Sequence, residues 1–140
     1  MAAGYSATPL ARKLGIKEFH RLALRHGPSG WDIPELPSGV GATERIAEAD
    51  VVVAFYRAHA ELAAEVNTFT AELGAEAALW IAWPRRAGGH TSDLTENGLR
   101  ELLLPTGLVD VKVAALDQDW SGLKFVWRKE HRARVAGLRD

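Results

Sequence analysis

The loop that follows Trp83-Pro84 collects side chains able to hold an anion or to move a proton. These candidate site residues are Arg85, Arg86, His90, Ser92 and Asp93. Neighbouring guanidinium groups can clamp a carboxylate or a phosphate, and the amides at the start of a helix favour an anion. Because a helical pattern begins near Asp93, the loop predicts a binding site for an anionic small molecule. The structural alternative is a flexible Gly88-Gly89 turn, with Asp93 as a helix cap and both arginines in solvent.

The same loop offers two groups for acid–base chemistry. His90 and Asp93 are the candidate catalytic residues of a small enzyme, because imidazole and carboxylate groups are common general acids and bases. His90, Ser92 and Asp93 also have the residue types of a hydrolytic triad, but residues within four positions of one another rarely achieve a triad's geometry. An enzyme that uses residues 85–93 is therefore the alternative to a binding module.

Tryptophans form a second set of candidate binding residues, because five occur among 140 residues. Exposed tryptophans often mark a ligand or partner surface. Trp120 lies in a turn pattern and Trp31 in a loop, whereas Trp80 and Trp83 are three positions apart and should point to opposite faces of a strand. We add Trp83 and Trp120 to the predicted site. The alternative is that each loop tryptophan folds back onto the core.

Metal chemistry finds little support in the residue spacing. The chain contains no cysteine, which excludes disulfides, thiolate metal sites and a thiol nucleophile. Its histidines are His20, His26, His59, His90 and His131. None has the spacing of a metal-binding helix, in which two histidines four apart enclose a glutamate. We predict no metal site, and His20 is expected to pack.

The turn that follows the first predicted strand also argues against a cofactor. A dinucleotide or adenosyl cofactor needs a glycine-rich turn that enters a helix after the first strand, followed by an acid that holds the ribose. Here the turn is His26-Gly27-Pro28-Ser29-Gly30, and no helical pattern follows it. The sequence therefore predicts no cofactor.

The elements that position these residues follow from hydrophobic periodicity. Val51–Phe55 and Ala78–Trp83 are continuous apolar runs, typical of buried parallel strands. An apolar stripe through Leu62, Phe69 and Leu73 predicts a single helix between them, over 57–73, with Glu65 facing water. The other predicted elements are a helix over 9–14 capped by Thr8, a strand over 19–25, a loop over 27–39, a short strand near 40–46, a helix from Asp93 with Glu96 in a capping box, a hairpin over 109–127 and a basic C-terminal helix.

This order of elements predicts the fold class. Strand, helix, strand, helix and hairpin indicate one α/β domain over 1–140, a small Rossmann-like three-layer sandwich with a mostly parallel sheet that ends in an antiparallel hairpin. Open α/β sheets bind ligands at the carboxyl ends of their strands. His26 and Arg57 follow the first two long strands and therefore join the predicted site.

Charge and hydropathy limit the partners. Because the net charge is −1, the protein surface as a whole is not expected to attract nucleic acid. The basic C-terminal segment is expected to be a solvated face. The longest apolar stretches reach roughly six to eight residues, far below the roughly 20 that span a bilayer. The start, Met1 to Tyr5, lacks an export pattern. We expect a cytoplasmic protein without a membrane or nucleic-acid partner, and homo-oligomer formation stays open.

Several stretches together carry a family resemblance. They are Tyr5–Ile16, Leu79–Arg86, Ser92–Glu96, Pro105–Asp110 and Trp120–Leu123. Through them the chain resembles an uncharacterised bacterial family, domain of unknown function 3052. The resemblance implies no activity, and two positions depart from the family pattern: Val111 replaces a polar residue, and Gly27-Pro28 replaces Ala-Pro. The second half of the chain is also similar to that of a class I methyltransferase.

The sequence thus predicts a small binding or accessory module that recognises an anionic small molecule or a partner protein.

Overall fold

The computed structural model describes residues 8–139, so the predicted lack of an export pattern in residues 1–5 lies outside the described residues. The strands are β1 (Arg21–Arg25), β2 (Gly41–Ala42), β3 (Val51–Phe55), β4 (Ala78–Pro84), β5 (Leu108–Ala115) and β6 (Trp120–Trp127). The helices are α1 (Leu10–Leu14), α2 (His59–Ala63), α3 (Val66–Glu72), α4 (Glu96–Leu103) and α5 (Lys129–Arg139). Short 3-10 helices lie at Ile46–Glu48, Arg86–Gly88 and Leu104–Thr106.

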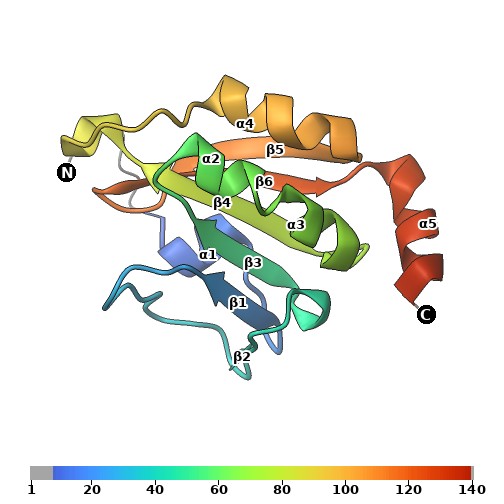
Figure 1. The fold of residues 1–140 in the computed structure, drawn as a ribbon. Helices are drawn as coiled ribbons and strands as arrows, with labels where there is room; N and C mark the ends of the chain where they lie inside the picture. Colours follow the sequence, from blue (N-terminus) through green and yellow to red (C-terminus); the bar gives the residue numbers. More distant parts are fainter. Residues whose placement is uncertain (1–7, 140) are drawn as a thin grey trace.

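The strands form one sheet with the order β2-β1-β3-β4-β6-β5 (Figure 1). β2, β1, β3 and β4 run parallel to one another, and β4 pairs with β3 in the register from Val51–Ala78 to Phe55–Ala82. Every residue of β3 and β4 is buried, as expected of strands covered on both faces. β6 then runs antiparallel to both β4 and β5. The predicted Rossmann-like class with a terminal hairpin is confirmed.

Helices cover both faces of the sheet, α2, α3 and α4 on one face and α1 on the other (Figure 1). The core accordingly divides into two clusters. Leu62, Phe69 and Leu99 pack on the first face together with Trp83, whereas Leu14 packs on the second. Trp80 belongs to the second cluster, which confirms that Trp80 and Trp83 point to opposite faces. No helix in the described part of the chain combines the length and the apolar character needed to cross a membrane.

Three predicted element boundaries were wrong. The strand near 40–46 shrinks to the two residues of β2, because only these pair with β1 before the chain turns into the 3-10 helix at Ile46–Glu48. The single helix over 57–73 is two helices, since Ala64 and Glu65 interrupt it. Pro9, and not Thr8, is the N-cap residue of α1, and it makes no side-chain capping bond.

Candidate functional site

The strand order reverses between β1 and β3. From β1 the chain continues outward to β2, whereas from β3 it continues through α2 and α3 to β4 on the opposite side. The carboxyl ends of two such strands enclose the crevice in which open α/β sheets bind ligands. A cavity of about 430 Å³ lies at this point, and we call it the switch-point cavity. Its lining residues are His26, Pro28, Phe55, Tyr56, Arg57, Glu61, Ala64, Glu65 and Trp120.

Glu65 organises the polar side of the switch-point cavity. Arg25, the last residue of β1, donates from Nε and Nη2 to the two carboxylate oxygens at 3.1 and 3.0 Å. His26 Nε2 lies 2.8 Å from Oε1, and the Tyr56 hydroxyl donates to the same oxygen. One carboxylate at the break between α2 and α3 therefore ties together the ends of β1 and β3.

The protonation states follow from these bonds. The hydrogen bonds from Arg25, Tyr56 and His26 lower the pKa of Glu65 to about 2, against the opposing effect of burial. Burial first, and then the hydrogen bond to Glu65, raises the pKa of Tyr56 far above its ordinary value. At neutral pH the network thus contains a carboxylate, a neutral phenol and a guanidinium.

Aromatic rings form the opposite side of the cavity. The Phe55 ring meets Trp120 edge to face with centroids 5.0 Å apart, and Trp31 meets Phe55 edge to face at 4.8 Å. The guanidinium of Arg57 lies over the Trp120 ring, 5.0 Å from its centroid, in a cation–π contact. Trp120 is only 6 % exposed, so its side chain packs in the core and also lines the cavity.

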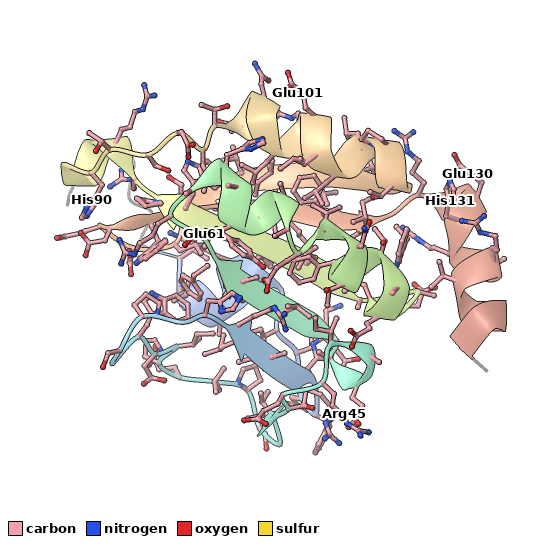
Figure 2. All side chains as sticks on the ribbon, viewed as in Figure 1. Arg45, Glu61, His90, Glu101, Glu130 and His131 are labelled. Carbon is pink, nitrogen blue, oxygen red and sulfur yellow. The ribbon has the colours of Figure 1, made fainter. Side chains whose placement is uncertain are left out.

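Glu61 lies on α2 at the edge of this site (Figure 2). Its Oε1 accepts hydrogen bonds from the backbone amides of Arg57 and Ala58, each at 2.9 Å. The carboxylate therefore satisfies amides at the beginning of α2, where a negative charge is favoured by the helix dipole. Glu61 holds the Arg57 backbone next to the cavity.

The polar side chains of the 85–93 loop form hydrogen bonds with other elements of the structure. His90 Nε2 pairs with Asp119 Oδ1 at 2.8 Å, at the outer edge of the molecule (Figure 2). Ser92 Oγ donates to the Arg57 carbonyl at 2.9 Å. Asp93 Oδ1 accepts from the His59 amide at 2.8 Å, at the start of α2. These bonds fasten the loop to its neighbours, and the residues do not line the switch-point cavity.

The predicted cap of the following helix was wrong. α4 begins at Glu96, and the Oγ1 atom of Thr95 accepts from the Gly98 amide at 3.0 Å. Asp93 precedes this cap by two residues, and its carboxylate accepts from the His59 amide instead. The Thr95 hydroxyl therefore satisfies one of the helix amides on which the predicted anion site depended.

Gly88 is also more constrained than the flexible turn predicted from the sequence would require. A Cβ atom built on Gly88 would lie 2.1 Å from the carbonyl oxygen of Gln118, a separation no side chain tolerates. The residue lets the loop pack directly against the turn between β5 and β6. Only Gly89, with φ +89°, has the left-handed backbone that a turn glycine supplies.

The two arginines of the predicted clamp lie in different environments. Arg85 is 8 % exposed, and its Nη1 lies 3.5 Å from the Gln118 carbonyl oxygen, whereas Arg86 is exposed on the 3-10 helix. Arg85 instead lines a second cavity of about 590 Å³. The lining of this cavity consists of Thr8, Arg12, Lys13, Arg85, Lys112, Val113, Ala114, Ala115 and Ser121.

The sequence analysis thus identified three residues of the switch-point cavity, His26, Arg57 and Trp120, but it did not identify Glu65 at the centre of the polar network. Glu65 was expected to face water, but the interruption between α2 and α3 turns it toward β1 and β3. Arg25 and Tyr56 did carry a signal, because each is the first polar side chain at the end of an apolar strand. Among residues 8–139, no group of three or more metal-ligating side chains has the geometry of a metal site.

Fold and cavity together define a small Rossmann-like α/β domain with an open crevice at its switch point. No protein-family model matches the chain, and a search of curated proteins finds no match either. Solved structures do share its fold. The B. subtilis tRNA methyltransferase TrmK superimposes with a TM-score of 0.53 at 13 % identity, over 93 % of this chain and 70 % of that one.

Two further structures of this fold contain S-adenosylmethionine. Fibrillarin from Aeropyrum pernix, with the natively bound compound, gives a TM-score of 0.51 at 16 % identity over 84 % of this chain and 73 % of its own. Magnesium protoporphyrin IX methyltransferase from Synechocystis gives 0.54 at 10 % identity, over 85 % and 74 %. At such identities the likeness establishes the fold alone.

Proposed function

We propose that this chain is a binding module that holds an anionic small molecule in the switch-point cavity. One observation carries the proposal: His26, Arg57 and Trp120, selected from the sequence, line a single cavity at the crevice where this fold class binds ligands. A concave cavity of about 430 Å³ suits a small molecule better than a flat protein surface. A cytoplasmic location and membership of the bacterial family named above are parts of this proposal.

The charges of the cavity favour an anion that has a flat apolar portion. Both lining carboxylates are occupied, Glu65 by Arg25, His26 and Tyr56 and Glu61 by backbone amides. The Arg57 guanidinium packs on the Trp120 ring and keeps its donors for a ligand. A planar ligand group would stack on Trp120 and Phe55 while its anionic group meets Arg57 and His26.

S-adenosylmethionine, which the two structural neighbours bind, fits these residues poorly. Between β1 and β2 the described chain contains no helix, so the turn after β1 offers no helix amides to a cofactor. His26, the first residue of this turn, has φ +58° and directs its imidazole to Glu65. We therefore assign the cavity to a different ligand. The enzyme alternative at residues 85–93 gains no support, because His90 and Asp93 bond to separate elements.

The proposal is tested by thermal unfolding with three probes: salicylate, adenosine monophosphate and S-adenosylmethionine. We expect the two anions to raise the melting temperature of the parent and to raise it less in Arg57→Gln, while S-adenosylmethionine has little effect. Arg86→Gln serves as the matched control, because Arg86 is exposed outside the cavity. An equal response of Arg57→Gln and the parent, or no response to either anion, contradicts the proposal.

A further inference from the structure

A further cavity of about 420 Å³ lies beside β1 and β2, at one border of the sheet (Figure 1). We call it the β1–β2 cavity. Part of the loop between these two strands, residues 32–36, contributes to its wall. It shares no lining residue with the switch-point cavity or with the second cavity. Its lining residues are Leu22, Leu24, Asp32, Ile33, Leu36, Ala42, Thr43 and Glu44.

Most side chains of the β1–β2 cavity are apolar. Leu22 and Ile33 are buried and belong to the core cluster on the α1 face of the sheet. Leu24 and Leu36 line the same cavity but remain 41 % and 40 % exposed. A single exposed leucine needs no explanation, whereas two that border one concave site leave apolar surface that a bound molecule would cover.

The walls of the β1–β2 cavity are held in place by contacts within the chain. In the loop, Trp31 Nε1 donates to Asp117 Oδ2 at 2.9 Å, and the Ile33 side chain is buried in the core. On the β2 side, the Thr43 amide donates to the Leu22 carbonyl at 3.0 Å. The cavity is therefore formed before a ligand arrives, so binding there requires little ordering of the chain.

The charged groups of the β1–β2 cavity are both acidic. Asp32 and Glu44 contribute carboxylates, and no lysine, arginine or histidine is among the lining residues. Within the described part of the chain, residues 8–139, neither carboxylate has a hydrogen-bond or ion-pair partner. Two carboxylates beside apolar side chains therefore remain as acceptors for a cation.

The arginines next in sequence to the lining residues bind other carboxylates. Arg21 and Arg45 both pair with Glu48, at 3.3 and 3.1 Å. Arg25 pairs with Glu65 at 3.0 Å, on the side of the switch-point cavity. These guanidinium groups are engaged elsewhere, so the fold does not neutralise the β1–β2 cavity with the cations that the chain places beside it.

We propose that the β1–β2 cavity binds a small organic cation, an amine that carries an apolar group such as an aromatic ring. The apolar group covers Leu24 and Leu36, and the ammonium group meets Asp32 and Glu44. Opposite charges attract more strongly where apolar side chains displace water. Both carboxylates repel an anion, and a neutral apolar compound leaves them unused. This site is independent of the proposed function, which concerns an anion in the switch-point cavity.

Titration of the isotope-labelled protein with phenethylamine, followed by NMR chemical shifts, tests the proposal. We expect the shifts to centre on the lining residues, and the amine to bind more tightly than phenethyl alcohol, its neutral analogue. Asp32 and Glu44 are exposed, so Asp32→Asn and Glu44→Gln should fold normally. Each should weaken amine binding roughly twofold to fivefold, because one ion pair is lost. Glu101→Gln, which removes an exposed carboxylate on α4, is the matched control and should bind as the parent does.

Three outcomes would overturn the proposal. The first is that phenethylamine does not bind, or binds no more tightly than phenethyl alcohol. The second is that Glu44→Gln and Glu101→Gln lose equal affinity, which would indicate attraction by the surface as a whole. The third is self-association of the parent that Leu36→Ala abolishes, which would assign the cavity to a second copy of the chain. Arg57→Gln should leave phenethylamine binding unchanged, which separates this test from that of the switch-point cavity.

Discussion

Replacing Glu65 by glutamine tests whether one carboxylate fastens the switch-point cavity. The substitution keeps the shape of the side chain but removes the charge that Arg25 and His26 contact. It also places an amide group, a donor, against the donors of Arg25. We expect Glu65→Gln to fold but to lose stability at neutral pH.

The size of the loss follows from the pKa of Glu65, which is lowered to about 2 from an ordinary 4.5. One pKa unit corresponds to about 1.4 kcal/mol, which sets an upper limit of about 3 kcal/mol. The Glu65 side chain is 23 % exposed, and solvent screening reduces this contribution to about 1–2 kcal/mol. The urea midpoint should therefore fall by roughly 1 M for a domain of this size.

The pH dependence gives the sharper test. Because the folded-state pKa of Glu65 is depressed, its stabilisation is complete above the ordinary pKa of 4.5 and is lost as the pH falls toward about 2. Urea unfolding of the parent and of Glu65→Gln should differ at pH 7 and converge as the pH approaches 2. Glu101→Gln, exposed on α4, is the control without such a difference. A stability gap that is absent at pH 7, or constant down to the lowest pH, would refute the reasoning.

Two other predictions concern separate parts of the molecule. Trp120→Ala should cost about 3–5 kcal/mol in urea unfolding because Trp120 is buried against Phe55, and a melting temperature unchanged by the substitution would assign Trp120 to the cavity alone. Thr95→Ala should cost about 1 kcal/mol by removing the α4 cap, and a larger loss from Asp93→Ala would show that Asp93 matters more for stability.

The central sheet could be predicted because local patterns determine it. Val51–Phe55 and Ala78–Pro84 are apolar throughout, and only strands covered on both faces need such runs. The hairpin was equally clear, since Leu123, Phe125 and Trp127 of β6 are buried and alternate with half-buried residues. These signals depend on the strand itself and on no distant residue.

The centre of the site could not be predicted, because it depends on tertiary contacts. The apolar stripe from Leu62 to Leu73 continues across the interruption at Ala64, so periodicity alone does not show that Glu65 leaves the solvent face. Asp93 has the sequence spacing of a cap, but its carboxylate accepts a hydrogen bond from the His59 amide at the beginning of α2 instead. Likewise, Lys13 and Arg85 lie 72 positions apart in the sequence, and only the fold brings them to the lining of the second cavity.

The position of β5 at the border of the sheet has a consequence for self-association. Within the described residues, β5 has a neighbour on one side only, and it exposes Val111 and Val113 to 55 % and 50 %. An edge strand with exposed valines is a template on which a second chain could add a strand. Here the pairing register shifts between Asp110 and Lys112, and the charge of Lys112 stands between the two valines. A bulge and an edge lysine are two features that β-proteins use to oppose edge-to-edge aggregation, and β5 has both.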